Sequence, residues 1–340
     1  MTPDSTLPVL FQPIADASAD GLVTLLTAAP DDIQAQLTAS GALLFRGWDI
    51  PDAAAFERIA RAIDPDLKND YLGTSPRNAV TPYVFTASEL PGFFPIPQHC
   101  EMSFTRTPPR RLFFACMVPN RAPGGETPLV DFRKVWNDLD PGVRERFATR
   151  GVTNIRNYSG PNGGAWWDPW KLKRWDEMFG TTDRDAVARR CEDEGFAMFW
   201  NDNGGLRLEN TQPATKAHPR TGEVAWFNHS QVFHRDAVPA EYDRIATRLG
   251  PIWRAWGILA RVLLGIKRIT QKESDVAMHC TFGDGTPIPA SDMDAVRDAI
   301  WKNLVAFSWQ RGDVLVIDND SVSHGRMPYR GERLITVAWA

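Results

Sequence analysis

Residues 312–326 of the chain read Gly-Asp-Val-Leu-Val-Ile-Asp-Asn-Asp-Ser-Val-Ser-His-Gly-Arg. The apolar run at 313–317 is typical of a buried strand, and the polar residues that follow end it before His324. Further on, Arg333 opens a second apolar run at 333–339, which predicts another strand at the end of the chain. We therefore expect one histidine and one arginine to lie beside the same sheet.

The tripeptide His99-Cys100-Glu101 supplies two further polar groups of the kind that bind metals. In an extended segment, side chains 99 and 101 project from the same face because side chains alternate with period two, and Cys100 faces away. With His324, this makes two neutral nitrogens and one hard anion on one face of a metal ion. About three of the six octahedral positions then stay open, as an iron oxygenase requires.

Arg333 has the chemistry of a carboxylate-binding residue. A guanidinium can hold a carboxylate through two parallel hydrogen bonds, which a lysine cannot reproduce. Beside a metal centre, such an arginine suits the far carboxylate of a diacid cosubstrate.

Six segments, which occur in order over nearly the whole chain from about Gly41, resemble the TauD/TfdA-type 2-oxoglutarate oxygenases, and among them the SyrP-like and clavaminate-synthase-like branch. The segments are 41–47 (GALLFRG), 99–104 (HCEMSF), 124–127 (GGET) with Asp131, 218–223 (HPRTGE) with 226–228 (WFN), 282–285 (FGDG), and 312–319 (GDVLVIDN) with 324–326 (HGR) and Arg333.

The resemblance implies a role for each matching residue and a fold. Fe(II) would be held by His99, Glu101 and His324, and the C5 carboxylate of 2-oxoglutarate by Thr127 and Arg333. The implied fold class is mainly β with α: a double-stranded β-helix (jelly-roll, cupin-like) core with flanking helices. We expect a single domain over residues 1–340, with a long insertion at about 157–290 between the two metal-binding motifs.

The resemblance also implies the reaction. An Fe(II)- and 2-oxoglutarate-dependent oxygenase uses O2 to oxidise an unactivated C–H bond and releases succinate and CO2, with hydroxylation as the default outcome and desaturation or cyclisation as variants. The implied substrate is a small molecule, either an amino acid, free or carrier-tethered, or a natural-product intermediate of secondary metabolism such as antibiotic biosynthesis. Val337 stands where relatives that bind a sulfonate carry a second arginine, and Glu101 stands where halogenases carry a small residue. Taurine oxidation and halogenation are therefore disfavoured.

Contacts with the substrate are harder to assign from sequence. Ser75, Arg77, Arg207 and Asn228 are the candidates. His229 and His234 are expected to line a pocket or to form structural hydrogen bonds, whereas His218, in a turn with proline and glycine, is expected at the surface. The insertion carries four tryptophans that suggest a lid over a partly apolar substrate: Trp166, Trp167, Trp170 and Trp175.

Two functions of other classes stay open. One is a metal-dependent enzyme on a cupin-like barrel that performs no oxygen chemistry, and the other is a non-catalytic jelly-roll binding module. Retention of Thr127 and Arg333 argues against the first, and an intact triad argues against the second.

Composition limits the partners and the location of the protein. The chain has 340 residues, of which 43% are hydrophobic. Its 38 basic and 42 acidic side chains give a net charge of -4, and the sequence contains no Lys/Arg block that would suggest a nucleic-acid partner. The N-terminus lacks the pattern of a secretory signal, so we expect a cytoplasmic protein. The apolar stretch at 252–269 contains Arg254, Arg261, Lys267 and Arg268, which predicts a helix packed on the protein body and no membrane partner. Four cysteines without a CxxC pairing are expected to be reduced and buried.

Local patterns also predict individual elements. Helices are expected at 31–38, 52–62, 132–140, 141–150, 183–194, 252–269 and 291–303, the last of these with Ser291 as its N-cap. Strands are expected at 41–47, 83–86, 111–118, 313–317 and 333–339, and no periodic strand pattern occurs between 157 and 200.

Overall fold

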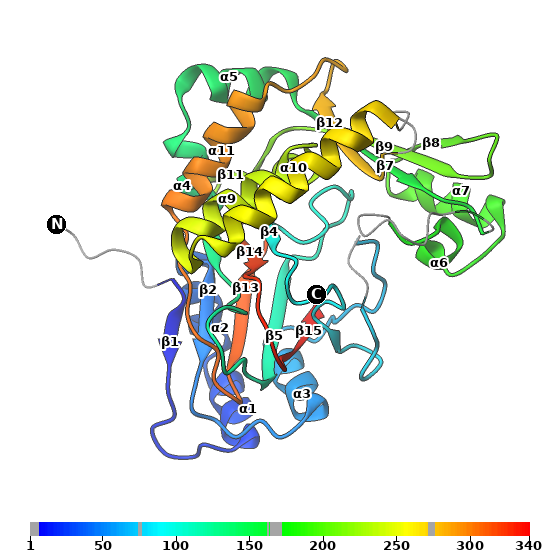
Figure 1. The fold of residues 1–340 in the computed structure, drawn as a ribbon. Helices are drawn as coiled ribbons and strands as arrows, with labels where there is room; N and C mark the ends of the chain where they lie inside the picture. Colours follow the sequence, from blue (N-terminus) through cyan, green and yellow to red (C-terminus); the bar gives the residue numbers. More distant parts are fainter. Residues whose placement is uncertain (1–6, 74–76, 162, 164–171, 271–275) are drawn as a thin grey trace.

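The computed structural model describes residues 7–73, 77–161, 163, 172–270 and 276–340 (Figure 1). Its largest sheet has six strands in the order β1-β2-β13-β5-β15-β3, and a three-stranded sheet has the order β4-β14-β6. The bounds of the first set are β1 (Val9–Phe11), β2 (Ala42–Phe45), β13 (Val314–Asp318), β5 (Arg111–Val118), β15 (Leu334–Trp339) and β3 (Phe85–Thr86). Those of the second are β4 (Ile96–His99), β14 (Val322–Arg326) and β6 (Leu129–Asp131).

The apolar runs of the sequence become strands that are buried on both faces. In β13, Val314 and Val316 belong to the core that includes the N-terminal helices, whereas Leu315 and Ile317 belong to the core that includes Leu129 of β6. Because side chains alternate along a strand, one continuous apolar run can serve two cores at once. The two sheets form the jelly-roll core that the sequence predicted, and the strands expected near 41–47, 111–118, 313–317 and 333–339 are confirmed.

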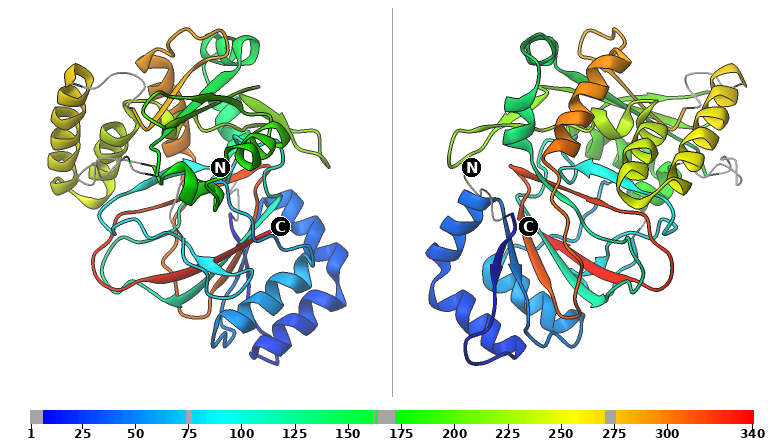
Figure 2. Two further views of the ribbon diagram at one scale, coloured as in Figure 1. Left: turned by 90° about the vertical axis from the view of Figure 1, so that its right-hand side faces the viewer. Right: turned by 60° about the vertical axis from the view of Figure 1, so that its left-hand side comes forward.

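Three helices cover the outer face of the six-stranded sheet: α1 (Ala19–Ala28), α2 (Pro30–Ser40) and α3 (Ala53–Ile63). They are the blue helices of Figure 2, on the side of the sheet away from the rest of the chain. Gly41 ends α2 in a left-handed conformation with a φ of 82°, and a Cβ there would lie 2.2 Å from Val322 Cγ2. Only glycine therefore allows α2 to turn directly into β2 at this distance from Val322, the first residue of β14.

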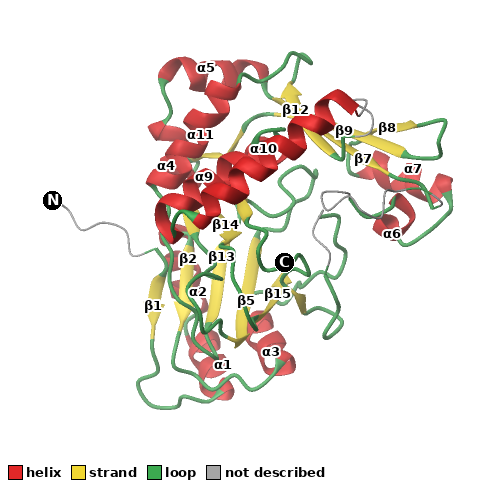
Figure 3. Cartoon of the chain, in the orientation of Figure 1, coloured by secondary structure: helices red, strands yellow, loops and turns green. Residues whose placement is uncertain are grey.

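A second layer lies at the opposite end of the molecule (Figure 3). It is a four-stranded sheet in the order β12-β7-β9-β8, accompanied by the hairpin β10-β11. The strands are β7 (Val152–Tyr158), β8 (Ala197–Trp200), β9 (Leu206–Gln212), β10 (Thr215–Ala217), β11 (Val224–Trp226) and β12 (Met278–Phe282). The helices are α4 (Phe132–Asp138), α5 (Pro141–Arg150), α6 (Trp175–Phe179), α7 (Arg184–Asp193), α8 (Ser230–Phe233), α9 (Ala237–Leu249), α10 (Ile252–Thr270) and α11 (Ala290–Lys302).

Three local expectations are corrected by the structure. Strand β8 and the end of β7 occupy part of the 157–200 region, where no strand was expected. Both pair with β9: β8 as a hairpin with a five-residue connection, and β7 from about fifty residues away. Helix α11 begins at Ala290 after Pro289, so Ser291 is not its N-cap. The strand expected at 83–86 is reduced to Phe85–Thr86, a short edge strand beside β15.

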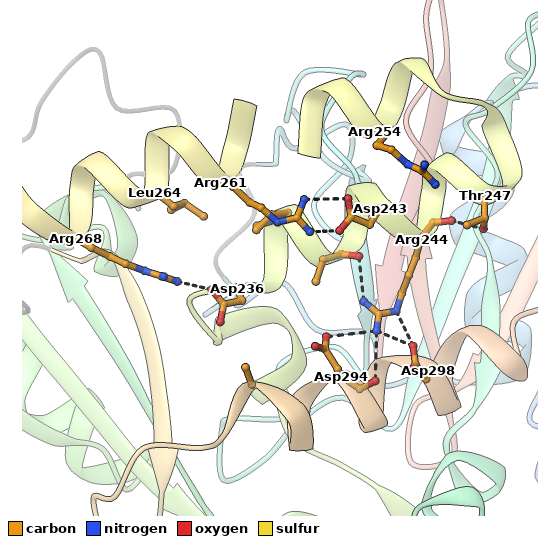
Figure 4. Close-up of a pocket in the computed structure, with 13 residues that line it drawn as sticks. Asp236, Asp243, Arg244, Thr247, Arg254, Arg261, Leu264, Arg268, Asp294 and Asp298 are labelled. Atoms are coloured by element: carbon orange, nitrogen blue, oxygen red, sulfur yellow. Dashed lines mark hydrogen bonds and ion pairs between the residues drawn. The ribbon is translucent and has the colours of Figure 1, made fainter. Parts of the chain in front are cut away.

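Helices α9 and α10 form a hairpin held by ion pairs that face a charged cleft (Figure 4). Arg261 of α10 pairs with Asp243 and Arg268 pairs with Asp236, while Arg244 of α9 reaches Asp298 of α11 at 2.6 Å. The expected helix at 252–269 is confirmed, and within the described parts of the chain no helix is long and apolar enough to cross a membrane. Exposed apolar residues line the rest of α10: Ile252, Ile258, Leu259, Val262, Leu263, Ile266 and Ile269.

The packing of β13 between two cores predicts a large stability difference between two leucines. Leu315 is fully buried, whereas Leu334 of β15 is 39% exposed. We expect Leu315→Ala to lower the free energy of unfolding by about 2–5 kcal/mol, and Leu334→Ala by less than about 1 kcal/mol. Urea unfolding of both variants checks this, and equal losses would contradict the assignment of Leu315 to the core between the sheets.

Candidate metal and cosubstrate site

The structure brings together the three residues of the predicted triad. In the antiparallel ladder between β4 and β14, His99 lies directly opposite His324, and their ring centroids are 4.4 Å apart. Glu101 Oε2 lies 3.7 Å from His324 Nε2. One ligand atom from each of the three residues lies within 4.8 Å of the others, which is close enough for all three to bind one metal ion.

The backbone at Glu101 differs from the extended segment that the sequence suggested. Strand β4 ends at His99, and Glu101 stands in the turn that follows. Asn319, just beyond β13, holds this turn: its Oδ1 accepts a hydrogen bond from Glu101 N at 2.7 Å, and its Nδ2 donates to Glu101 O at 3.0 Å. The carboxylate therefore converges with the histidines because of a tertiary clamp, and Cys100 points into the core as expected.

The protonation states of the triad fit a divalent cation. His99 Nδ1 lies 2.9 Å from the carbonyl oxygen of Pro97, so a proton on Nδ1 would leave the Nε2 lone pair for a metal. Burial lowers the pKa of His99 and holds the pKa of His324 well below its usual range, so both rings are neutral at pH 7. Burial alone would raise the pKa of Glu101, but Arg77 and the neighbouring histidines outweigh it and lower that pKa.

Arg77, a candidate substrate residue, lies against the ligand carboxylate. Its Nη2 is 2.6 Å from Glu101 Oε2, and its guanidinium stacks over the Tyr71 ring at 4.5 Å from the centroid. Tyr71 donates a hydrogen bond of 3.3 Å to Glu101 Oε1. Arg77 and Tyr71 thus hold the carboxylate beside the histidines, a role that nothing in the local sequence indicated for Tyr71.

The predicted cosubstrate pair, Thr127 and Arg333, also comes together. Arg333 donates from Nε to Gly125 O at 2.7 Å and from Nη2 to Thr127 Oγ1 at 3.3 Å, and Trp309 Nε1 donates to the same hydroxyl at 3.1 Å. Burial lowers the pKa of Arg333 to about 10. In the part of the chain that the structure describes, no carboxylate lies within ion-pair distance of Arg333, so this enclosed cation is left for an external anion.

Three other substrate candidates receive no support from the geometry. Ser75 lies outside the described residues. Arg207 is paired with Glu209 on β9 at 2.6 Å. Asn228 is fully buried, and it donates to Ala214 O at 2.7 Å and accepts from Ser230 N at 2.9 Å, so its amide is occupied in shaping a turn. Neither Arg207 nor Asn228 is among the residues that line the cavity beside the triad.

His229 and His234 have the two roles that were expected of them. His229 lines the cavity, with its ring centroid 5.3 Å from that of His99 and its Nδ1 2.6 Å from Ser103 Oγ. His234 is structural: its Nε2 lies 3.3 Å from Ile288 O, and its Nδ1 accepts from Asp236 N at 3.3 Å.

The expectation that His218 lies at the surface is wrong. Its side chain is buried, and its Nε2 lies 3.0 Å from Asp318 Oδ2. Asp320 completes a second group of possible ligands, but Lys216 already holds its carboxylate at 2.5 Å. His218 Nδ1 accepts hydrogen bonds from the backbone, so this group forms a satisfied internal network behind the triad.

A cavity of about 160 Å³ opens beside His99 and Glu101. Most of its wall is apolar, and both layers of the protein contribute to it. Ile96 lies on β4 and Phe94 just before it, whereas Val232, Val238 and Met278 belong to the region between the two metal-binding motifs. This cavity suits a small substrate or one end of a longer one.

The fold and the His-Glu-His centre define an enzyme of the iron-dependent jelly-roll type, and comparison with known proteins gives the family. Residues 10–339 match the family described as taurine catabolism dioxygenase TauD, TfdA family. The chain is 29% identical to the dapdiamide synthesis protein DdaC of Enterobacter agglomerans, covering 93% of this chain and 90% of that protein. It is 30% identical to a clavaminate synthase-like protein of Arabidopsis thaliana, covering 87% and 80%. The chain therefore belongs to the TauD/TfdA family and is a 2-oxoglutarate-dependent dioxygenase that uses Fe(II) and O2.

Solved structures show the same fold at low sequence identity. A taurine dioxygenase from Burkholderia xenovorans superposes with a TM-score of 0.52 at 11% identity, covering 99% of this chain and 87% of that one. PvcB of Pseudomonas aeruginosa gives a TM-score of 0.52 at 12% identity, covering 97% and 84%.

The burial of His234 predicts a pH-dependent loss of stability. Burial, followed by the charge of Arg297, lowers the pKa of His234 from 6.5 to about 4. The unfolded chain takes up a proton near pH 6.5 while the folded protein does not, so acidification between pH 6.5 and 4 favours unfolding. We expect this residue to contribute up to about 1.4 kcal/mol per pH unit in that window.

Urea unfolding at a series of pH values, with His234→Gln beside the unsubstituted protein, measures the effect. The glutamine variant should lose less stability between pH 6.5 and 4. Parallel curves for the two proteins would show that His234 does not titrate differently in the folded and unfolded states.

Proposed function

We propose that His99, Glu101 and His324 hold the Fe(II) of this dioxygenase, and that Thr127 and Arg333 hold the far carboxylate of 2-oxoglutarate. The observation that carries the second assignment is Arg333, an enclosed guanidinium that binds a hydroxyl and a carbonyl oxygen but no carboxylate of the described chain. A diacid cosubstrate would supply the missing anion. The whole chain is proposed to form one domain, with residues 157–290 as an insertion that supplies part of the cavity wall.

The chemistry of the bound iron, 2-oxoglutarate and O2 is the oxidation of a substrate C–H bond with release of succinate and CO2. The residues of this chain position the reactants. The triad occupies one side of the metal site, Arg77 keeps Glu101 ionised, and the apolar wall at Phe94, Ile96 and Val232 excludes water from the substrate. We propose hydroxylation as the default outcome, with desaturation or cyclisation where the substrate radical reacts internally.

The proposed substrate is an amino acid, free or carrier-tethered, or a natural-product intermediate. Support comes from the similarity to a dapdiamide synthesis protein and from the small, mostly apolar cavity. Val337 is buried where sulfonate-binding relatives carry a second arginine, which argues against taurine. The four cysteines are buried free thiols, which fits our proposal that the enzyme works in the cytoplasm.

The metal assignment predicts a spectroscopic result that the two rival functions do not. Anaerobic addition of Fe(II) and 2-oxoglutarate should give the weak visible charge-transfer band of the chelate. His99→Ala should abolish the band by removing a ligand, whereas the control His279→Ala, on β12 outside the triad, should retain it. Absence of the band in the folded, unsubstituted protein would favour a metal enzyme without oxygen chemistry or a non-catalytic binding module.

The cosubstrate assignment predicts a selective loss of 2-oxoglutarate affinity. Arg333→Lys keeps the charge but loses the two-pronged hydrogen bond, so we expect the dissociation constant of 2-oxoglutarate to rise at least about ten-fold. Titration of the chelate band measures this constant. The matched control Arg330→Lys replaces an exposed arginine three positions earlier and should leave the dissociation constant of 2-oxoglutarate unchanged. The affinity for iron should be unchanged in both variants. An unaltered constant in Arg333→Lys would refute the assignment.

A further inference from the structure

Glu241 is a buried acid in the wall of the cavity that contains His99 and Glu101. It lies on α9, and only 7% of its surface is exposed. The wall on its own helix is otherwise apolar, formed by Ala237 and Val238. Among the described residues that line this cavity, Glu241 and the proposed ligand Glu101 are the two carboxylates.

The carboxylate of Glu241 has little compensation from the protein. Trp301 Nε1 donates one hydrogen bond of 3.3 Å to Oε2, and within the described ranges Oε1 has no hydrogen-bond partner and no cation lies at ion-pair distance. Burial raises the pKa of Glu241, and the attraction of Trp301, Arg244 and Arg297 offsets this only in part. A carboxyl group with one weak protein partner can accept further hydrogen bonds from a ligand in the cavity.

Neither of the two nearby guanidiniums forms a direct ion pair with Glu241 in the described part of the chain. Arg244 Nη2 lies 2.6 Å from Asp298 Oδ1 of α11 (Figure 4). Arg297 Nη1 lies 3.5 Å from Asp294 Oδ1, whereas its Nε and Nη2 have no hydrogen-bond partner within the ranges that the structure describes. Both guanidiniums attract the Glu241 carboxylate from beyond ion-pair distance, and neither supplies a hydrogen-bond donor to it in the described residues.

We propose that Glu241 binds an ammonium group of the substrate and so orients the substrate between the apolar wall and the metal centre. This inference rests on the proposed function and narrows its substrate class to amine-bearing molecules. An ammonium would supply both the charge and the hydrogen-bond donors that Oε1 lacks. A neutral analogue of the same shape would leave the carboxylate of Glu241 unpaired. The cavity would therefore favour amine-bearing molecules over neutral ones.

The test compares apolar L-amino acids with the same molecules lacking the amino group, each offered as the free acid and as the pantetheine thioester. Substrate-triggered succinate release is measured with the unsubstituted enzyme, Glu241→Gln and the control Asp243→Asn. Glutamine keeps an oxygen for Trp301 but removes the charge. Asp243 is on the same helix and pairs with Arg261 outside the cavity.

We expect the unsubstituted enzyme and Asp243→Asn to prefer the amino compounds, and Glu241→Gln to need at least a ten-fold higher concentration of them for half-maximal release. The chelate band should be equal in all three proteins. The inference would be overturned if the unsubstituted enzyme showed no preference for amino over deaminated compounds. It would also be overturned if Glu241→Gln reached half-maximal release at the same concentration as the unsubstituted enzyme. Either result would leave the oxygenase function intact. Failure of the chelate band in the unsubstituted protein would instead overturn the proposed iron site.

A second variant keeps the proposal testable if Glu241→Gln folds poorly. Val238 lies one helical turn before Glu241 and lines the same cavity. Val238→Lys would place a permanent ammonium beside the acid and compete with the substrate amine. The preference for amino compounds should then disappear while the chelate band persists, and a retained preference would contradict the role of Glu241.

Discussion

The antiparallel register between β4 and β14 is the constraint on which the site depends. It sets His99 opposite His324, and a slip of one residue would turn one of the two rings to the other face of the sheet. The apolar packing of β13 and the turn after it determine where β14 begins, and Asn319 in that turn also holds the backbone of Glu101. Packing of the core and placement of the ligands therefore share one segment of chain.

Around this register the protein buries charges that its own residues do not fully neutralise. Arg333 binds only neutral oxygens of the described chain, and Arg77 and Glu101 face each other beside two neutral imidazoles. Glu241 has one weak donor. Each such group lowers the stability of the free protein, and each becomes favourable when a ligand of opposite charge arrives. The unpaired charges of Arg333 and Glu241 thus indicate where cosubstrate and substrate are expected.

The two layers divide these tasks. The jelly-roll sheets carry the triad and the pair Thr127 and Arg333, which are the groups for the chemistry common to the family. The region between the two metal-binding motifs supplies the wall on which Glu241, Val238 and Met278 lie. Changes in this wall can alter which substrate binds without disturbing the register of β4 and β14, because it packs around the site and does not form the ladder.

The sequence alone determined the buried strands, since a continuous apolar run such as 313–317 encodes burial on both faces, and the family motifs indicated the triad together with Thr127 and Arg333. Only the tertiary structure placed Glu101 in a turn held by Asn319, buried His218 against Asp318, and paired β7 with β9. It alone turned Glu241 into the cavity. Local periodicity reports whether a residue faces inward, but the group that it meets there depends on segments that are distant in the chain.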